Sequence, residues 1–422
     1  MTDLIDSTVA AKTGLSQLTP RHALMPVGLI VLLGGLLFMP QPLGTDLYLP
    51  SMPALVKAFD VSLGQLAHTM TVFLIGFAMA QLLAGLLADR FGRKPVALWG
   101  MAIYTVASAI CAAAQSFEML LAARFLQAAG ACTCFAVARA IVRDSFAAHD
   151  GQYVLSKINS YMTAAPVTGV LLGGVLVSTL GWRANFGILV IFGCCAGTFV
   201  ALKLKETLAP ADMQRINWHT LRQSYALILR NRTFLSYTAT AFLGSAGLFC
   251  HLSASSIVYI QILQQTPLLF SVCFALGCFG YLSGTILLRR WVGRLGSAGV
   301  IRRGGLFQVC AMVVSASLAG LGVVHWAVIA GCNFFFLIGY GLLMSACQAG
   351  SVAPFPERAG TAGSLMGAIQ ISGGAMAGWW MGIAFNGTVF PMLLSQCLFG
   401  FGVWTLASTV LQRYAIEKLS TR

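Results

Sequence analysis

The sequence predicts an all-α integral membrane protein with twelve transmembrane helices in two pseudo-symmetric halves of six. Composition, the spacing of apolar runs and the placement of Lys and Arg each support this fold class. Apolar residues make up 58% of the chain, charged residues make up 9%, and the mean hydropathy is +0.82. A soluble domain carries about a quarter charged residues. A 422-residue chain this poor in charge cannot cover a water-facing surface, so most of its surface must face lipid.

Twelve apolar runs are long enough to cross a bilayer, which takes about 20 residues for a hydrocarbon core of roughly 30 Å. The first six lie near 25–48, 63–87, 96–115, 119–140, 157–180 and 185–203. The second six lie near 234–258, 268–288, 304–322, 325–349, 361–385 and 390–411. We divide the chain into a tail (1–24), a first half (25–203), a linker (204–232), a second half (233–411) and a tail (412–422).

The basic residues predict the orientation. With the N-terminus inside, 23 of the 26 Lys and Arg residues fall in cytoplasmic segments. Lys57 and Arg183 fall outside, and Arg124 lies within a span. Because cytoplasmic loops of membrane proteins are rich in Lys and Arg, both termini and the linker are expected in the cytoplasm. We expect a bacterial inner-membrane location and no cleaved signal peptide.

Several function classes are not expected. The net charge of +14 comes from short loops, not from a basic patch interleaved with aromatic residues, so nucleic acid is not an expected partner. A phosphate-binding G-x-x-x-x-G-K-[ST] motif is missing, so ATP is not the direct energy source. The twelve cysteines lie inside apolar runs without a CxxC pair and are interpreted as packing residues. We therefore expect no enzyme activity, no metal and no cofactor.

A weak internal repeat supports the division into halves. The run Arg90-Phe-Gly-Arg-Lys94 follows the second span, and Arg289-Arg-Trp-Val-Gly-Arg294 follows the eighth, although the second copy has lost its acidic residue. Many secondary transporters are built from two such halves with the substrate site between them near the midplane.

Charges inside the spans are the most informative residues, since each costs about 2.5–3.5 kcal/mol on insertion scales. Asp46 lies in the outer part of the first span and Arg124 in the fourth. We interpret Asp46 as a carboxylate in a central cavity and Arg124 as a charge held within its span. The alternatives are that Asp46 is a helix-end residue facing periplasmic water and that the Arg124 head reaches cytoplasmic water.

The loop after the second span is a candidate gate, because a positive loop needs neither an aspartate nor glycines at fixed spacing. Asp89 can pair with basic groups or with a helix N-terminus across the cytoplasmic face, and Asp144 is a candidate partner for Arg93. The proposed gating residues are Gly85, Asp89, Arg90, Gly92, Arg93, Lys94 and Asp144.

The fifth span contains a kinking proline and a small-residue face, which predict close helix packing. Its residues of interest are Pro166, Gly169, Gly173 and Gly174, and the eleventh span repeats the spacing with Gly363, Gly367, Gly374 and Gly378. Candidate substrate-binding residues are aromatic or small polar side chains on spans expected to line a cavity: Tyr48, Phe73, Gln127, Tyr161, Phe249, Ser253, Tyr259 and Gln370. Ordinary packing is the commoner role for any one of them, and for His251.

These motifs resemble the major facilitator superfamily, in particular its twelve-span drug:proton antiporters. Gly85 to Lys94 matches the signature of the loop between spans two and three, and Arg124-Phe-Leu-Gln127 resembles the fourth-span signature, with Ala128 where Gly is usual. Further segments are similar to the bicyclomycin/chloramphenicol-resistance (Bcr/CflA) branch: Thr45 to Pro50, Gly181 to Phe186, Glu206-Thr-Leu208 and Pro354 to Ala362. Val170 departs from the Gly-Pro pair that is usual in the fifth span of antiporters.

The resemblance implies a monomeric antiporter that exports small amphipathic drugs or toxic metabolites in exchange for protons, with membrane lipid as its surroundings. Arg124 would then tune the affinity of Asp46 for a proton. The alternatives are a dedicated metabolite exporter or a proton-coupled uptake symporter on the same fold. A membrane sensor that does not transport is more remote.

Overall fold

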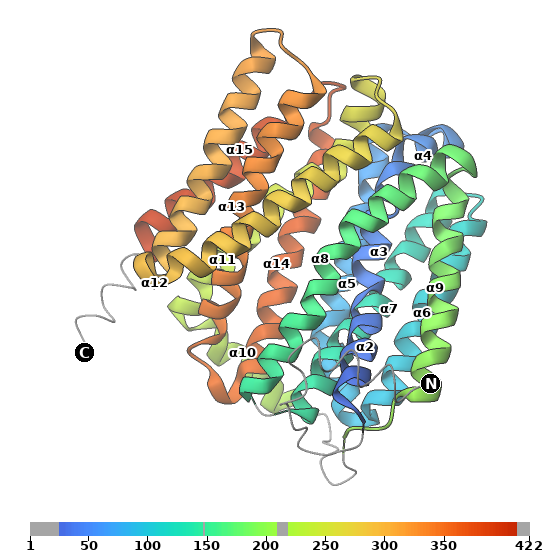
Figure 1. Cartoon of the computed structure of the whole chain (residues 1–422), viewed down its shortest axis with the longest axis vertical. Coiled ribbons are helices and arrows are strands. Elements are labelled where there is room, and N and C mark those ends of the chain that lie inside the picture. Colours follow the sequence, from blue (N-terminus) through green and yellow to red (C-terminus); the bar gives the residue numbers. More distant parts are fainter. Residues whose placement is uncertain (1–24, 147, 209–217, 412–422) are drawn as a thin grey trace.

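The computed structural model describes residues 25–146, 148–208 and 218–411, and all regular structure in them is helical. The N-terminal bundle contains α2 (Val27–Phe38), α3 (Pro40–Asp46), η2 (Leu49–Ser51), α4 (Met52–Phe59), α5 (Leu63–Phe91), α6 (Arg93–Ala113), α7 (Phe117–Ser145), α8 (Ala148–Thr179) and α9 (Trp182–Lys203). The C-terminal bundle contains α11 (Arg232–Ile257), η4 (Val258–Ile262), α12 (Pro267–Gly320), α13 (Trp326–Val352), η5 (Pro356–Arg358), α14 (Ala359–Ala384), α15 (Phe390–Leu406) and η6 (Ala407–Leu411). The two bundles lie side by side (Figure 1).

The twelve-span fold class is confirmed. Nine helices of the described residues are long and apolar enough to cross a membrane, where each run of consecutive helical pieces counts once. One of these, α12, contains both the eighth and the ninth predicted span, while α8 and α14 correspond to the fifth and eleventh.

Three features of the structure differ from the pattern of straight spans joined by loops that the sequence predicts. The stretch between the eighth and ninth spans is helical, and α12 changes direction at Gly296, whose φ of 66° is accessible to glycine. A further helix, α10 (Trp218–Leu229), lies in the segment assigned as a linker. The first span is broken into α2, α3, η2 and α4, and prolines lie at or next to the starts of the last three pieces.

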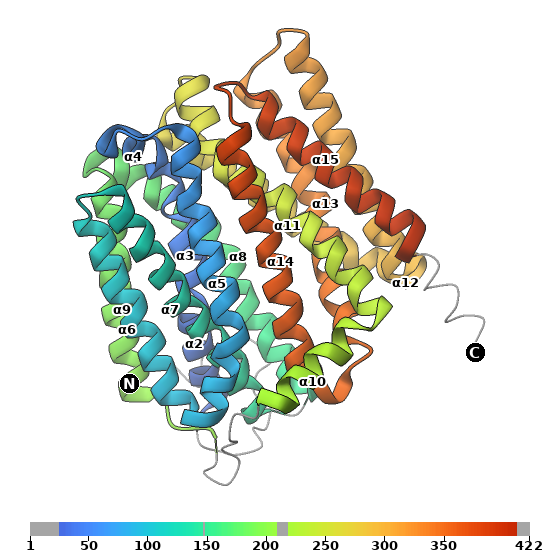
Figure 2. The ribbon, with the colours of Figure 1, turned by 180° about the vertical axis from the view of Figure 1, so that it is seen from behind.

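We name the two ends of the molecule by residues. The Arg93 face is the end where α5 turns into α6 at Gly92, α7 and α9 end, and α12 bends at Gly296. The N-terminal part of this face lies at the bottom of Figures 1 and 2, where α10 also lies, whereas the bend of α12 lies higher, beside the α12 label. The opposite face carries the ends of α4, α6 and α8 and the start of α13.

The two bundles meet mainly through α5 with α14 and through α8 with α12. Glycines permit the first contact: a Cβ on Gly378 would lie 2.6 Å from Thr71 Oγ1, and Gly367 faces Gln81. On the second contact, Ser271 Oγ of α12 donates to the Val170 carbonyl of α8 at 2.8 Å. The expected small-residue face of the eleventh span is therefore part of the interface between the bundles.

We predict that Gly378→Leu lowers the melting temperature of the purified protein, because a larger side chain must displace Thr71 on the neighbouring helix. Overpacking of this kind costs about 1–3 kcal/mol. Gly331→Leu on α13 is the matched control, since a Cβ there meets no atom within 4 Å. Tryptophan fluorescence during heating in detergent measures both variants, and equal melting temperatures would show that the contact is not tight.

Candidate functional site

Asp46 lies at the break in the first span. Its helix, α3, starts with Pro40 and also contains Pro42, and neither residue can donate a backbone hydrogen bond. Asp46 is the last residue of α3 and is 6% exposed. The alternative that it faces periplasmic water at a helix end does not describe this geometry.

The Asp46 carboxyl group has a hydroxyl neighbour and, among the described residues, makes no ion pair. Thr45 Oγ1 lies 3.1 Å from Asp46 Oδ1, 3.1 Å from the Pro42 carbonyl oxygen and 3.2 Å from that of Gln41. A single hydroxyl hydrogen has to be shared among these three acceptors. On the far side, Gly169 of α8 packs against Asp46 Cβ.

Arg124 is completely buried and is held by dipoles and rings. Its Nη1 donates to the Gly44 carbonyl at 2.7 Å and to Gln127 Oε1 at 2.6 Å. The guanidinium carbon lies 4.5 Å from the centre of the Tyr48 ring and 4.4 Å from that of Phe73, which is cation–π geometry. Arg124 therefore contacts the first span two residues before Asp46, but through backbone.

The alternative that the Arg124 head reaches cytoplasmic water is wrong, because the side chain is fully covered. Arg124 also lies nearer to the Phe117 end of α7, which is the end at the opposite face, than to the Ser145 end at the Arg93 face. Burial of the charge is made possible by the oxygen atoms and aromatic faces around it, which replace part of its hydration.

Three candidate substrate residues belong to the surroundings of Arg124. Tyr48 and Phe73 stack on its guanidinium group, and Gln127 also donates to Ser108 Oγ at 2.8 Å. All three are buried, and Tyr48 OH bonds with Thr69 Oγ1 at 2.6 Å. In this structure they support the arginine and present no surface to a cavity, so packing describes them better than ligand contact.

The other candidates lie apart from that group. Phe249, Ser253 and Tyr259 are buried on α11 and η4, where Phe249 packs against Gly374. Gln370 on α14 is half-buried. The side chain of Tyr161 is outside the part of the chain that the structure describes.

The glycines of α8 serve two contacts. Gly173, like Gly169, faces Leu47 of the first span, whereas Gly174 faces Pro267 and Ser271 of the other bundle. Pro166 lies inside α8. Helix α8 is thus packed between the break in the first span and α12.

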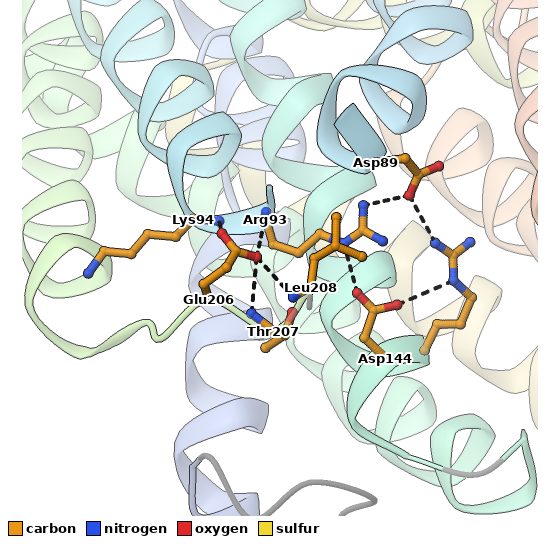
Figure 3. A network of polar contacts seen from close by, with 8 residues as sticks. Asp89, Arg93, Lys94, Asp144, Glu206, Thr207 and Leu208 are labelled. Carbon is orange, nitrogen blue, oxygen red and sulfur yellow. Dashed lines mark hydrogen bonds and ion pairs between the residues drawn. The ribbon is translucent and has the colours of Figure 1, made fainter. Parts of the chain in front are cut away.

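The loop at the Arg93 face forms an ion-pair network (Figure 3). Arg93 is 1% exposed, with Nη1 2.6 Å from Asp89 Oδ1 and Nε 2.7 Å from Asp144 Oδ2. Arg143 lies 3.5 Å from Asp89 and 3.7 Å from Asp144. The expected pair between Arg93 and Asp144 is present, and two acids are balanced by two arginines.

Arg143 also reaches the other bundle. Its Nη1 lies 3.0 Å from the position that a Cβ on Gly360 would take, at the start of α14. The network therefore touches both bundles at the Arg93 face.

Glu206 belongs to this site as well, although the sequence indicated it only as part of a segment similar to the Bcr/CflA branch. Its carboxylate accepts from the backbone N–H groups of Arg93 at 2.9 Å and Lys94 at 3.0 Å, and from Thr207 and Leu208 at 3.0 Å (Figure 3). The free N–H groups at a helix N-terminus attract an anion, so Glu206 caps α6 from 113 residues away. The signal was present, because Glu206 is an acid between Lys203, Lys205 and the basic linker, as Asp89 is in its loop.

Gly92 makes this capping possible. Its φ is 93°, and a Cβ there would lie 2.6 Å from Glu206 Oε2. Glycine is therefore required both for the turn and for the approach of the carboxylate.

His251 pairs with Asn333 at 3.1 Å and stacks on Phe274, as expected for a buried packing residue. Within the described ranges, groups of three or more His, Cys, Asp or Glu side chains that could hold a metal ion are not found.

Comparison with known proteins agrees with the predicted resemblance. Residues 31–378 match the family model described as Major Facilitator Superfamily. A bicyclomycin resistance protein homolog from Haemophilus influenzae is 28% identical over 369 residues, which cover 87% of this chain and 92% of the relative. Multidrug resistance protein MdtL from Salmonella newport is 30% identical over 358 residues, which cover 80% of this chain and 84% of that protein.

Solved structures show the same fold. The D-xylose-proton symporter matches with a TM-score of 0.69 at 15% identity, covering 90% of this chain and 96% of that one. The partially occluded inward-open xylose transporter XylE from E. coli matches with a TM-score of 0.71 at 12% identity, covering 91% and 98%. With a family model that spans most of its length and a 30% identical relative, this chain belongs to the major facilitator superfamily.

Proposed function

We propose that this protein exports small amphipathic compounds across the bacterial inner membrane in exchange for protons, by alternating access between its two bundles. The observation that carries the proposal is Asp46, a buried carboxyl group at the break of the first span, two residues from the backbone carbonyl that binds a buried arginine. A buried carboxylate is costly in a membrane protein unless it has a use. Proton uptake and release is such a use.

The surroundings of Asp46 suit a group that alternates between charged and neutral forms. When ionised, Asp46 accepts from the Thr45 hydroxyl. When protonated, it can donate to Thr45 Oγ1 instead, and the Thr45 hydrogen then turns to the Pro42 carbonyl. The hydrogen bond between Asp46 and Thr45 can therefore form in both states.

Arg124 would act on Asp46 through the first span. Movement of the Gly44 carbonyl towards or away from the guanidinium group changes the position of the Asp46 side chain, two residues later. In this mechanism Asp46 takes a proton when the cavity faces the periplasm and releases it to the cytoplasm, and substrate binds in alternation.

The network at Asp89 would lock the cytoplasmic face. Asp89 and Asp144 fix Arg143 at the first turn of α14, so loss of those ion pairs would free the two bundles to separate there. We place the substrate between the bundles near Phe249, Ser253 and Gln370, where Ser253 lies beside the contact of Gly378 with Thr71.

The relatives support export. Their printed names associate them with bicyclomycin resistance and multidrug resistance. A monomer driven by the proton gradient, without a cofactor, is part of the same proposal. Growth of an efflux-deficient host that expresses this protein, against a panel of antibiotics, would identify a compound, and its flux in energised vesicles would separate export from uptake.

We predict the topology from the positions of the basic residues. In a cysteine-free background, single cysteines at the exposed positions Gln115 and Thr388 should react with an impermeant thiol reagent added to intact spheroplasts. A cysteine at the exposed Arg294 should react only after lysis. Labelling of Arg294→Cys in intact spheroplasts would show that the protein has the opposite orientation in the membrane.

We predict that Asp46→Asn abolishes proton-driven efflux and partly retains substrate binding, because the amide keeps the shape but cannot titrate. The measurement is proton release from detergent-purified protein on addition of the compound found in the growth panel. Asp60→Asn is the control, since Asp60 is an exposed acid at φ 50°, a conformation that asparagine tolerates. Equal proton release by Asp46→Asn and wild type would place the coupling group elsewhere.

If one proton is exchanged for one neutral molecule, net charge moves, and the Asp46 cycle should also respond to membrane potential. The expected driving force is about 2.3 kcal/mol per 100 mV for each charge.

We predict that Asp89→Asn and Glu206→Gln both slow transport while substrate affinity stays close to that of wild type. The first removes one acid of the ion-pair network and the second removes the anionic cap of α6. A coupling contact is worth about 1–3 kcal/mol, enough to shift a two-state population severalfold or more. Glu118→Gln, an exposed acid in the first turn of α7, is the control for loss of charge. If both variants transport at the wild-type rate, the network has a structural role and does not act as a gate.

A further inference from the structure

The C-terminal bundle carries an unbalanced positive charge at the Arg93 face. Between residues 218 and 411 the chain has nine arginines and a single acid, Glu357. Asp89 and Asp144 pair with Arg93 and Arg143, which belong to the N-terminal bundle. Arg289, Arg290 and Arg294 of the other bundle are not neutralised by these acids.

Two of these arginines continue an apolar stripe on α12. Val272, Leu276, Phe279 and Ile286 are exposed by 43 to 54%. At about 100° per residue, these four positions and then Arg290 and Arg294 fall within roughly 80° of one another around the helix. The first part of α12 crosses the front of the molecule in Figure 1, with one side away from the other helices.

The length of the stripe matches one bilayer. Val272 and Arg290 are 18 residues apart, which is roughly 27 Å at 1.5 Å per residue, close to a hydrocarbon core of about 30 Å. The two arginines thus lie at headgroup depth, directly beyond the surface that contacts acyl chains.

The surroundings leave these arginines free to bind an anion. Arg289, Arg290 and Arg294 are exposed and, among the described residues, make no ion pair. Arg303, after the bend, stacks over the Trp291 ring at 5.4 Å, so one more cation is fixed beside them.

The corresponding place in the N-terminal bundle differs. Arg90 also ends an apolar helix, but Asp89 precedes it, whereas Leu288 precedes Arg289 in the second copy of the motif. An anion near Arg90 would meet the carboxylates of Asp89 and Asp144, and near Arg290 it would meet only arginines within this segment.

We propose that α12 binds an anionic phospholipid, with its phosphate at Arg290 and Arg294 and one acyl chain along Ile286 and Phe279. A soluble anion would use the arginines but not the stripe, and a neutral lipid would use the stripe but not the arginines. The joint arrangement favours a lipid with a net negative headgroup. Basic groups at a membrane surface attract such lipids.

The experiment is a lipid titration of the purified full chain, followed by native mass spectrometry. Dioleoylphosphatidylglycerol should bind wild type at least tenfold more tightly than dioleoylphosphatidylcholine. The preference should be lost in Arg290→Gln/Arg294→Gln and kept within threefold in Arg290→Lys/Arg294→Lys. Glycerol phosphate in excess should not displace the lipid.

The matched control is Lys205→Gln/Arg358→Gln, which removes two exposed charges that each stand next to a glutamate in the sequence. It should keep the preference within threefold. Equal binding of the two lipids to wild type, or an unchanged preference in Arg290→Gln/Arg294→Gln, overturns the proposal. Displacement by glycerol phosphate would show a phosphate site without a lipid.

A second measurement needs no change of charge. Phosphatidylglycerol with brominated acyl chains should quench tryptophan fluorescence more than brominated phosphatidylcholine does, and the excess should disappear in Trp291→Phe. An excess that persists in Trp291→Phe would place the bound lipid away from α12 and overturn the assignment.

Discussion

The burial of one positive charge constrains much of the N-terminal bundle. Arg124 has no exposed surface, and among the described residues its partners are a backbone carbonyl, an amide, a thioether and two aromatic rings. Gly44 lies in the last turn of α3, where a helix leaves carbonyl groups without an intrahelical partner, so the end of α3 at the break in the first span supplies an acceptor for the arginine. The same break also determines the position of Asp46, which is the last residue of α3. A change that straightens the first span would therefore have two effects at once: it would remove a hydrogen-bond acceptor from Arg124, and it would move the carboxyl group of Asp46.

The two bundles manage charge in different ways. At the Arg93 face, the N-terminal bundle pairs arginines with Asp89 and Asp144 and caps α6 with Glu206. The second copy of the motif has lost the acid, and its arginines lie exposed on α12. A network in which two acids balance two arginines suits a contact that opens and closes, because each of these charges has a protein partner. A loop without acids suits a stable attachment to the surrounding membrane, which we propose for α12.

Hydropathy and charge predicted the fold because lipid is a uniform apolar solvent. Each span must be long and apolar enough to cross it, whatever the other spans do. The pair of Arg93 with Asp144 could also be predicted, since both motifs end on the same side of the membrane. The break of the first span and the continuation of α12 through the eighth and ninth spans were not predicted, because an apolar window averages over prolines and a single glycine. Glu206 was missed as a cap because its partner helix lies 113 residues away, and hydropathy has no distance information. Tyr48, Phe73 and Gln127 stay a prediction as substrate-binding residues, and their contact with the buried Arg124 could not be predicted, because aromatic residues can line a cavity or cover a cation.

The Glu206 contact also bears on how the chain is made. The Glu206 carboxylate accepts hydrogen bonds from four backbone N–H groups, which belong to residues 93, 94, 207 and 208. Once Leu208 has left the ribosome, the first bundle has within itself every group that this cap needs, before any helix of the second bundle is synthesised. The start of α6 can therefore be capped by Glu206 while the remaining spans are still entering the translocon. The order of synthesis thus allows the loop that the finished transporter would use as its gate to be capped before the second bundle is made.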